Sequence, residues 1–394
     1  MKEQIVGFSL SKSSEIVGDN SPQLHSLIDC VKCGGPIVSR NLRKHSVKDQ
    51  NTAAPYVYCE TSGTTGNPRT IRRRPITWIR SFEVNREMFA LNESDIYAVP
   101  AHLDHSLSLY AALEALHIGA DVAHLNHTSP KSQVRQIKKC NVTVIYATPS
   151  QLYKLLGGCS VSDVRSLNCV RHLFVGGGKL HDTLRDDLLE IFPNSELREF
   201  YGSSETSFVT ITDANTPHGS VGKPYPGVSI RIGMSTQQSG STQEIWVDSP
   251  YLFDGYETAD KGCTRRDGNF VTVGDAGQLD SEGCLFLTGR TDRMFTVADN
   301  NIYPEAIEQV MLNIPGVTNC VVLPMHDAKR ANVAAAVVEG NGSAELEKQI
   351  KRHCRKSLHP LAVPRLLVFL EKIPMLPSGK PDAEMLRHHL ETRS

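Results

Sequence analysis

The stretch "VRHLFVGGGKLHDTLRDDLLEIFP", residues 170 to 193, reads as a β-strand, a glycine turn and a helix in succession. Its first part is an apolar run typical of a buried strand, and "LHDTLRDDLLEIFP" has the apolar spacing of an amphipathic helix. The same alternation occurs upstream, where "PYVYCE", "DIYAVP" and "NVTVIYA" resemble strands and "SLSLYAALEALHIGA" resembles a helix. This order predicts α/β layers around a largely parallel sheet.

The sequence changes character twice further along. From about residue 220 to 287, short strands alternate with Gly, Asp and Pro turns, which predicts an antiparallel β subdomain. Beyond residue 290, a helix in "YPEAIEQVMLNIPGV" is followed by strands, a second helix and the strand "RLLVFLE". We therefore predict a large domain, residues 1–289, and a small α+β domain, residues 290–394. The polar segment "LTGRTDRMFTV" contains the boundary, with a hinge near Asp292, and a cleft between two domains is a common ligand site.

Composition narrows the class of protein. The 394 residues are 40% hydrophobic and 22% charged with a net charge of −1, so nothing points to nucleic acid or an anionic membrane as a partner. The N-terminus has no signal-peptide pattern and no apolar run is long enough for a membrane span, so we expect a cytoplasmic protein with reduced cysteines. Cys30 and Cys33 could be half of a zinc site with His25 and His45. A turn with two incidental thiols fits better, because no second CxxC pair follows.

The segment "CETSGTTGNPRT", residues 59 to 70, places glycines and hydroxyl side chains beside Arg69. Only two residues separate Gly63 from Gly66, so the segment is not a Walker A loop, which needs four residues there and a GK[ST] ending. Glycine still allows close backbone approach, and hydroxyls and arginine donate to phosphate oxygens. Taken alone, the segment is a phosphate loop or a plain polar loop. The arginines at 72 to 74 suggest a solvated edge rather than a nucleic-acid patch, because no aromatic residues are interleaved with them.

Five further islands occur downstream in a fixed order: "VGGGKL" (175–180), "FYGSSE" (200–205), "VGDAG" (273–277), "GRTDRM" (289–294) and "LPSGKPD" (376–382). Together with "TSGTTGNPR" they resemble the adenylate-forming superfamily, which includes acyl-CoA synthetases, aryl-acid ligases and the adenylation domains of peptide synthetases. The wording "EIFPNSELREFYGSSETSFVT" is most similar to bacterial acyl-CoA-ligase-type members. The resemblance implies a large layered α/β N-terminal domain with an antiparallel β subdomain, and a small mobile α+β C-terminal domain.

The resemblance also implies a nucleotide site. The residues expected to hold the triphosphate are Thr61, Ser62, Gly63, Thr64, Thr65, Gly66 and Arg69. The backbone of Gly176, Gly177 and Gly178 would line the adenine and acyl pockets. Tyr201, with Gly202 beside it, would stack on adenine. Asp275 would bind the ribose hydroxyls, and Arg290 would contact nucleotide oxygens.

Four residues are implied in catalysis. Ser204 would direct its hydroxyl at the α-phosphate, and Glu205 would bind Mg²⁺, since a hard carboxylate suits that ion. Lys380, on the mobile domain, would bridge carboxylate and phosphate during adenylation. In "PAHLDHSLSLY", His105 is the best candidate to gate the acid, followed by Ser106. Asp104 is a lesser alternative, as the residue that would hold a substrate ammonium.

The implied activity is ATP-dependent activation of a small carboxylic acid through an acyl-adenylate, followed by transfer to a thiol, with CoA as the expected co-substrate. An acyl carrier protein or an amine is the alternative acceptor, and a non-catalytic relative that binds nucleotide or acyl-adenylate is a third possibility. Two departures from the family pattern motivate these alternatives. Only 57 residues precede Tyr58, fewer than is usual, and Asp299 in "VADNNIYP" replaces a glycine that normally lines the pantetheine tunnel.

Overall fold

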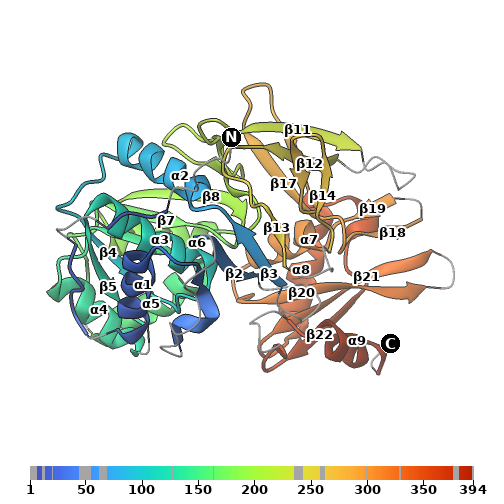
Figure 1. The fold of residues 1–394 in the computed structure, drawn as a ribbon. Helices are drawn as coiled ribbons and strands as arrows, with labels where there is room; N and C mark the ends of the chain where they lie inside the picture. The colour runs from blue at the N-terminus through green and yellow to red at the C-terminus, as the bar shows by residue number, and fades with distance from the viewer. Residues whose placement is uncertain are drawn as a thin grey trace.

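The computed structural model describes residues 7–10, 14–19, 21–43, 55–61, 69–126, 128–162, 164–234, 243–257, 262–298, 300–327, 330–375 and 381–392. Figure 1 shows a layered α/β region in blue and green, an antiparallel region in yellow, and a C-terminal unit in orange and red. This arrangement confirms the fold class expected from the sequence.

The central sheet has seven strands in the order β10-β9-β8-β7-β6-β4-β5. The parallel strands are β4 (Ile96–Val99), β5 (Asp121–His124), β6 (Val144–Ala147), β7 (His172–Val175) and β8 (Glu196–Ser203). At one edge, β9 (Ser207–Ile211) and β10 (Lys223–Pro224) pair antiparallel. Strands β6 and β7 are buried along their whole length, as expected for parallel strands covered on both faces.

Helices cover both faces of this sheet. One face packs against α1 (Pro22–Cys33), α2 (Pro75–Met88) and α3 (Ser106–Ile118), with the 3₁₀ helix Ser39–Arg43 nearby. The other face packs against α4 (Pro130–Lys139), α5 (Pro149–Ser162) and α6 (Asp182–Ile191). Four of these helices begin at proline, whose fixed φ suits the first helical turn. The sequence thus marks the start of these helices locally.

A separate four-stranded sheet consists of β1 (Ile37–Val38), β2 (Val57–Thr61), β3 (Arg69–Arg73) and β13 (Gly255–Tyr256). The strand in "PYVYCE" therefore lies outside the parallel sheet, contrary to its grouping with the other strands in the sequence. The reason is its connection. Between this strand and β3 lies only the segment 62–68, the candidate phosphate loop, and the two strands pair antiparallel. A parallel pair of consecutive strands would need a longer crossover connection, usually a helix.

The predicted antiparallel subdomain is present. Its strands are β11 (Ser229–Met234), β12 (Gln243–Asp248), β14 (Arg265–Asp267), β15 (Phe270–Thr272), β16 (Asp275–Leu279) and β17 (Leu285–Arg290). The tight turns between neighbouring strands use glycines with positive φ, at Gly268 and Gly283.

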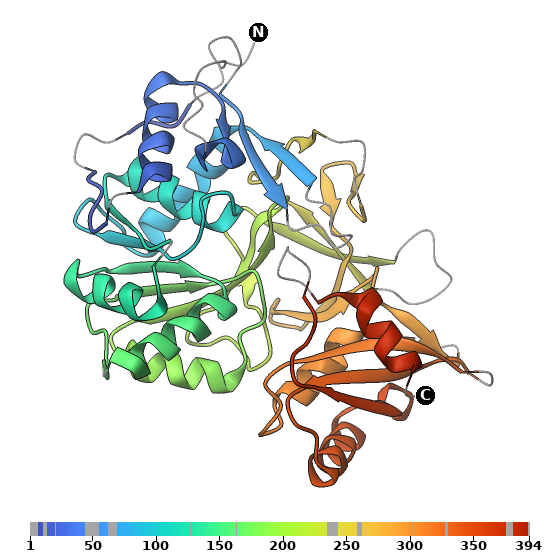
Figure 2. The ribbon, with the colours of Figure 1, turned by 90° about the horizontal axis from the view of Figure 1, so that it is seen from below.

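The C-terminal unit, orange and red in Figure 2, holds a three-stranded sheet of β20 (Cys320–Asp327), β21 (Ala331–Glu339) and β22 (Leu366–Leu370). Its other elements are β18 (Phe295–Val297), β19 (Asn300–Ile302), α7 (Pro304–Leu312), α8 (Ala344–Ser357), the 3₁₀ helix Pro360–Ala362 and α9 (Ala383–Glu391). Separate hydrophobic clusters cover the two faces of the sheet. The caps of α8 and α9 are local, because Ser343 and Asp382 accept hydrogen bonds from backbone amides in the first turn.

No helix among the described residues is long and apolar enough to cross a membrane. Cys30 is buried on α1, and Cys33 is exposed at the end of that helix. The Nδ1 of His25 forms a hydrogen bond with the carbonyl of Ser21. His45 lies outside the described residues. Across the described ranges, no group of three or more His, Cys, Asp or Glu side chains is placed to hold a metal ion.

Candidate nucleotide-binding and active site

A cavity of about 490 Å³ lies beyond the carboxyl ends of β7 and β8. This is the edge of a parallel sheet at which α/β proteins usually bind ligands. Strands β16 and β17 and the segment at Cys263 and Thr264 form the facing wall. Nine residues expected from the sequence line the cavity: Arg69, Gly177, Gly178, Tyr201, Gly202, Ser204, Glu205, Asp275 and Arg290. Segments separated by more than two hundred positions in the chain therefore meet here.

The turn between β8 and β9 carries Ser204 and Glu205, and its backbone is anchored from behind. The Arg73 guanidinium donates to the Ser204 carbonyl at 2.5 Å, and the Phe253 amide donates to the Glu205 carbonyl at 2.9 Å. Within the turn, the Ser203 hydroxyl accepts hydrogen bonds from the amides of residues 205 and 206. Because the carbonyls are held on one side, the Ser204 hydroxyl and the Glu205 carboxylate are presented to the cavity.

Gly202 is required for this turn. A Cβ atom at this position would lie 1.8 Å from the carbonyl oxygen of Ser207, so no larger residue fits without moving the backbone. The pairing of β8 with β9 shifts register between Tyr201 and Gly202. Such a bulge re-aims the side chains that follow it. The glycine thus sets the direction in which Ser204 and Glu205 point.

Glu205 is the candidate metal ligand. Its side chain is part of a residue only 8% exposed, and its Oε1 accepts a 2.7 Å hydrogen bond from the Tyr256 hydroxyl. Within the described part of the chain, Oε2 has no hydrogen-bond partner. Mg²⁺ in phosphate-transfer sites is commonly bound by one or two carboxylates together with substrate phosphates. A single carboxylate with an open oxygen fits that ion only when a phosphate ligand is also present.

The phosphate-type loop enters and leaves the site at one point, because Thr61 at the end of β2 pairs with Arg69 at the start of β3. The Arg69 guanidinium lies over the ring of Tyr256, 5.4 Å from its centroid, and lines the cavity. Its charge is therefore on the same side of the cavity as Glu205. Five expected phosphate ligands lie outside the described residues: Ser62, Gly63, Thr64, Thr65 and Gly66.

At the other end of the cavity, Asp275 is held between two partners. The Tyr201 hydroxyl donates to its Oδ2 at 2.8 Å, and Arg290 donates to its Oδ1 at 3.0 Å. Burial raises the pKa of Asp275, although Arg290 and the tyrosine hydrogen bond oppose that rise. Burial alone would lower the pKa of Arg290, but Asp275 and Asp292 outweigh it, so the pKa lies above its ordinary value. These contacts hold the Tyr201 ring and the Asp275 carboxylate in fixed positions on the cavity wall.

The three glycines after β7 have different surroundings. Gly177 and Gly178 line the cavity, and Gly177 has a φ of +74°, a conformation that favours glycine. Gly176 is buried under the ring of Phe200. Of the expected pocket glycines, two thus face the cavity and the third supports an aromatic ring.

The residues expected to face the acid lie at the start of α3. Ser106 is the first residue of the helix, and its Oγ accepts a 3.2 Å hydrogen bond from the Ser204 hydroxyl. His105 precedes it, is exposed, and bridges the backbone of Glu60. Asp104 is half-buried in the preceding turn. Ser106 therefore contacts the Ser204 turn directly, and none of Asp104, His105 and Ser106 lines the nucleotide cavity.

Sequence reasoning missed Arg73 and Tyr256, which hold side chains of the site in place. Arg73 was expected on a solvated edge, but it is fully buried, lies over the Trp78 ring, and donates to Ser207 and to backbone carbonyls. Tyr256 was not singled out, although it contacts both Glu205 and Arg69. The alternation of β3 contained a signal for Arg73, because every second residue of that strand points inward.

A second feature lies on the C-terminal unit. A hollow of about 610 Å³, here called the basic hollow, is lined by Arg330, Lys351, Arg355 and Arg365 with Pro360, Val363 and Pro364. Lys351 pairs with Glu347 at 2.6 Å, and Arg365 approaches Asp327 at 4.0 Å. The guanidinium groups of Arg330 and Arg355 form no ion pair within the described residues. Two guanidinium groups that no described carboxylate pairs, in a hollow with no acidic lining residue, favour an anionic ligand.

Two further residues singled out in the sequence, Lys380 and Asp299, also lie outside the described residues. The loop that contains Lys380 begins and ends at one place, because Met375 and Pro381 pair in an isolated antiparallel bridge. Asp299 falls between β18 and β19, which pair with each other. The structure therefore places the ends of both segments but not the two side chains.

Comparison with known proteins gives matches over most of the chain. A family model described as AMP-binding enzyme matches residues 9–257, and one described as AMP-binding enzyme C-terminal domain matches residues 306–380. The uncharacterized acyl-CoA ligase YhfT of Bacillus subtilis (strain 168) is 30% identical over 345 residues, a match that covers 86% of this chain and 69% of that protein.

Solved structures match as well. O-succinylbenzoate coenzyme A synthetase (MenE) from Bacillus subtilis, in complex with AMP, superposes with a TM-score of 0.71 at 25% identity, covering 84% of this chain and 68% of that one. The amide bond synthetase McbA from Marinactinospora thermotolerans gives a TM-score of 0.72 at 24% identity, covering 84% of this chain and 69% of the other.

Proposed function

This chain belongs to the AMP-binding enzyme family, and we propose that its 490 Å³ cavity activates a small carboxylic acid with ATP and passes the acyl group to CoA. The enzyme is an AMP-forming acid–thiol ligase that works through an acyl-adenylate. One observation carries the assignment to this cavity. Nine residues from five separate sequence islands converge on one cavity at the ligand-binding edge of a parallel sheet.

In the first step, a carboxylate oxygen of the acid attacks the α-phosphorus of ATP, the bond to the β-phosphate oxygen breaks, and pyrophosphate leaves. Two anions must approach each other, so the main task of the protein is to neutralise charge and fix positions. Arg69 would pair with the β- and γ-phosphates, and the Ser204 hydroxyl would donate to the α-phosphate. Lys380 would bridge the acid carboxylate and that phosphate. Mg²⁺ bound at Glu205 would supply further neutralisation of the phosphate oxygens.

The nucleoside would occupy the other end of the cavity. The ring of Tyr201 would stack on adenine, and the backbone at Gly177 and Gly178 would allow the base to approach closely. Asp275 would accept hydrogen bonds from the ribose hydroxyls. Arg290 holds that carboxylate in place and would contact nucleotide oxygens itself. Support for this orientation comes from the fixed Tyr201–Asp275–Arg290 chain, which requires little reorganisation on binding.

We also propose that the chain divides at residue 289 and that Asp292 is the hinge. Arg290 contacts Asp275 of the large domain and Asp292 next to it. Only three residues later, Arg293 pairs with Glu305 and Glu308 of α7 in the C-terminal unit. Arg290 thus belongs to an ion-pair cluster on the large domain, and Arg293 belongs to one on the C-terminal unit. The short connection between them suits a hinge between two rigid parts.

The basic hollow supports CoA as the acceptor. CoA carries three phosphate groups at the end of a long thiol arm, and arginine guanidinium groups suit phosphate recognition. Arg330 and Arg355 are available for such contacts because no ion pair holds them within the described residues. A carrier protein presents one phosphate diester on the same arm, and an amine presents none, so the hollow favours CoA over both.

The activity test is a mass-spectrometric product assay. The purified enzyme is incubated with ATP, Mg²⁺ and a panel of aliphatic, aryl and amino acids, with and without CoA. We expect acyl-AMP without CoA and acyl-CoA with it for one class of acid. Acyl-AMP that never becomes a thioester would reject CoA as the acceptor. The absence of any adenylate, with nucleotide still bound, would favour the non-catalytic alternative.

The acceptor site has its own test. Replacing both Arg330 and Arg355 with alanine should raise the KM for CoA at least about tenfold, since each lost charge-assisted phosphate contact costs about 1.5 to 3 kcal/mol. Formation of acyl-AMP without CoA should not change. Lys348→Ala is the matched control, because Lys348 is an exposed lysine of α8 that does not line the hollow. An unchanged KM in the double variant would contradict the assignment.

Lys380 is tested by separating the two steps. Lys380→Ala should abolish formation of acyl-AMP from ATP, while preformed acyl-AMP should still give acyl-CoA. This split is expected because the lysine would be needed only where carboxylate and phosphate charges meet. If Lys380→Ala leaves both steps unchanged, the mechanistic assignment of this residue is wrong.

A further inference from the structure

We propose that Tyr256 is a positioning residue for two groups of the site at once. Its hydroxyl sets the Glu205 carboxylate for Mg²⁺, and the face of its ring sets the Arg69 guanidinium for the phosphates of ATP. This inference rests on the proposed function and adds the residue that places the metal ligand and the phosphate-binding cation relative to each other. All three side chains line the same cavity.

Strand pairing brings Tyr256 and Arg69 to the same face of one sheet. Tyr256 on β13 lies opposite Ile71 on β3 in an antiparallel pair. Arg69 lies two positions before Ile71 on β3, so the three side chains point to the same face. Diagonal neighbours across a strand pair are within reach of long side chains. The guanidinium accordingly lies over the tyrosine ring, 5.4 Å from its centroid.

A glycine makes room for this guanidinium. A Cβ atom built on Gly262 would overlap the Arg69 guanidinium, and the φ of +54° at this position also favours glycine. The cation is thus in contact with both the tyrosine ring and the backbone of residue 262. An aromatic face attracts a guanidinium without neutralising its charge, as a carboxylate would. The ring therefore holds Arg69 at the cavity wall and leaves its charge available for phosphate.

The hydroxyl end of the same ring belongs to a chain of two hydrogen bonds. Tyr256 donates to Oε1 of Glu205 at 2.7 Å, and the Thr264 hydroxyl lies 2.7 Å from the tyrosine oxygen. A phenol has one hydrogen and an ionised carboxylate only accepts, so the threonine must donate to the tyrosine. The chain therefore runs from Thr264 through Tyr256 to Glu205, and it orients the carboxylate that would bind the metal.

A further aromatic contact holds the ring. Phe253 packs against Tyr256 in a T-shaped arrangement, with 5.0 Å between the ring centroids. The backbone amide of Phe253 also donates to the Glu205 carbonyl at 2.9 Å. The tyrosine and the residue that it orients are thus fixed to the same neighbour. Groups held in place before the ligand arrives require little reorganisation when it binds.

The two groups that Tyr256 contacts would act on the same part of ATP. Metal ions in nucleotide sites bridge oxygens of the β- and γ-phosphates, which are also the phosphates proposed for Arg69. The separation of the metal ligand and the arginine must therefore match one triphosphate. Because the hydroxyl of Tyr256 contacts one group and its ring contacts the other, this side chain sets that separation.

Binding of ATP in the absence of acid and CoA tests the hydroxyl. Calorimetric titration of the purified enzyme gives the Kd for ATP in EDTA and in saturating Mg²⁺. Tyr256→Phe removes the hydroxyl and keeps the ring. Its Kd in Mg²⁺ should rise at least about tenfold, as expected when a metal ligand loses the partner that orients it. Its Kd in EDTA should be unchanged.

Gly262→Ala tests the ring side. The added methyl group would displace the guanidinium from the ring, so the Kd for ATP in EDTA should rise about threefold or more. The factor by which Mg²⁺ improves binding should be unchanged. Gly268→Ala is the matched control, because its φ of +59° is similar, nothing lies within 4 Å of a Cβ atom there, and it does not line the nucleotide cavity. It should change neither Kd.

The hydrogen-bond chain has a graded test. Thr264→Val should raise the Kd in Mg²⁺ by about two- to fivefold, because the tyrosine oxygen loses the donor that orients it. Thr264→Ser should restore the wild-type value. Tyr251→Phe is the control for loss of a phenol hydroxyl, since that hydroxyl donates to the Pro226 carbonyl and neither residue lines the cavity. Thermal unfolding checks that each variant is folded.

The outcomes are distinguishable. A Tyr256→Phe variant whose Kd rises equally in EDTA and in Mg²⁺ would show a packing role only and overturn the inference. Wild-type binding by this variant under both conditions would overturn it as well. A wild-type Kd in EDTA for Gly262→Ala would overturn the part that concerns Arg69. If the wild-type enzyme binds no ATP, the proposed function fails and this inference fails with it, whereas ATP binding without any adenylate formation rejects the proposed function alone.

Discussion

At the scale of single residues, Arg73 organises the active-site turn without lining the cavity. Burial lowers its pKa to about 10, which still leaves the side chain charged at neutral pH. Its guanidinium donates to the Ser204 carbonyl, the Ser207 hydroxyl and the Tyr251 carbonyl. An arginine suits this position because several partners lie in different directions and a lysine ammonium cannot reach all of them.

Arg73→Lys should therefore lower the free energy of unfolding by about 2 kcal/mol, because buried acceptors lose their donor. It should also lower kcat for adenylation, since the Ser204–Glu205 turn loses an anchor. Urea denaturation and pyrophosphate release measure the two effects. Arg72→Lys is the control, because Arg72 is half-exposed and pairs only loosely with Glu257, at 3.6 Å. Equal effects of the two substitutions would contradict the claim that Arg73 anchors the Ser204–Glu205 turn.

Glu205 gives a prediction about metal dependence. Glu205→Gln keeps the size of the side chain and can still accept the Tyr256 hydrogen bond, but it removes the charge that Mg²⁺ requires. The Mg²⁺ concentration for half-maximal adenylation should rise at least about tenfold. Glu257→Gln, which changes a nearby carboxylate outside the cavity, should leave it unchanged. A magnesium titration followed by pyrophosphate release decides between these outcomes.

At the scale of elements, the β8–β9 hairpin depends on close contact between two backbones. Gly202→Ala should lower the free energy of unfolding by about 2 to 4 kcal/mol and weaken ATP binding, because the added methyl group would collide with the Ser207 carbonyl. Gly255→Ala is the matched control on β13, since nothing lies within 4 Å of a Cβ atom there. Denaturation midpoints and nucleotide titration measure both. A Gly202→Ala variant as stable as the control would mean that the turn can relax.

The observed strands and helices also show which elements local sequence patterns can predict. The strands β4, β6 and β7 and the helices α3, α6 and α7 were all expected within a few residues of their observed bounds, because burial periodicity and helix-start signals such as proline are local. The sheet to which β2 belongs was not expected correctly. Its sequence resembles any short buried strand, and only its pairing with β3 and β1 assigns it to a separate sheet.

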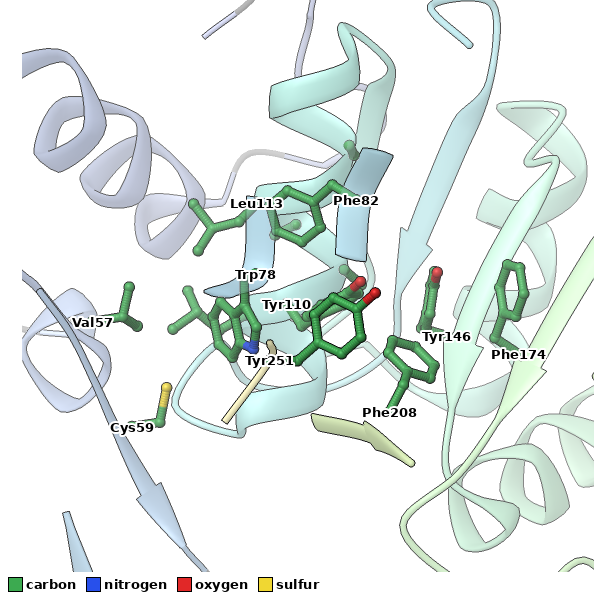
Figure 3. Close-up of a cluster of buried hydrophobic side chains, with 14 of the residues drawn as sticks. Val57, Cys59, Trp78, Phe82, Tyr110, Leu113, Tyr146, Phe174, Phe208 and Tyr251 are labelled. Carbon is green, nitrogen blue, oxygen red and sulfur yellow. The ribbon is translucent and has the colours of Figure 1, made fainter. Parts of the chain in front are cut away.

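At the scale of the whole molecule, a buried polar cluster joins the helices to the central sheet. Glu114 on α3 accepts hydrogen bonds from Asn85 on α2 and from Tyr146 on β6. Tyr225, beyond β10, donates to the Asn85 side-chain oxygen at 2.6 Å. Figure 3 shows Tyr110 and Tyr146 of this region between helix and sheet. A carboxyl group so deeply enclosed makes the stability of the large domain depend on pH.

Burial raises the pKa of Glu114 to about 7, although the hydrogen bonds from Asn85 and Tyr146 oppose the rise. Below the ordinary value of 4.5 both the folded and the unfolded state are protonated. Between 4.5 and about 7 the unfolded state loses its proton first, so the free energy of unfolding falls as pH rises. Above pH 7 or so the carboxyl group is ionised in both states, and the free energy of unfolding stays about 3 kcal/mol below its value in acid.

Glu114→Gln should remove this part of the pH dependence. The free energy of unfolding of the variant, relative to wild type, should increase from acid to neutral pH and then stay constant. Urea denaturation at a series of pH values measures it. Glu190→Gln is the control, because that exposed carboxylate is in water in both states. Parallel curves for wild type and Glu114→Gln would contradict the assignment.

The sequence by itself determined the family, the α/β fold class and the residues that could form a nucleotide site. Short islands such as "FYGSSE" and "VGDAG" carry that information locally, because each is one turn or strand end with fixed chemistry. The match of the AMP-binding enzyme model to residues 9–257 confirms the family. The individual functions of Ser204, Glu205 and Asp275 remain predictions, tested by the experiments above.

Only the tertiary structure decided which of these residues meet and what surrounds them. The burial of Arg73 depends on Ser207 and Tyr251, more than a hundred positions away, and the Phe200 ring covers Gly176 because two parallel strands are in one register. The Tyr201–Asp275–Arg290 chain likewise joins the parallel sheet to the antiparallel subdomain. Contacts between distant segments are set by packing of the whole chain, and no local pattern in a single sequence specifies them.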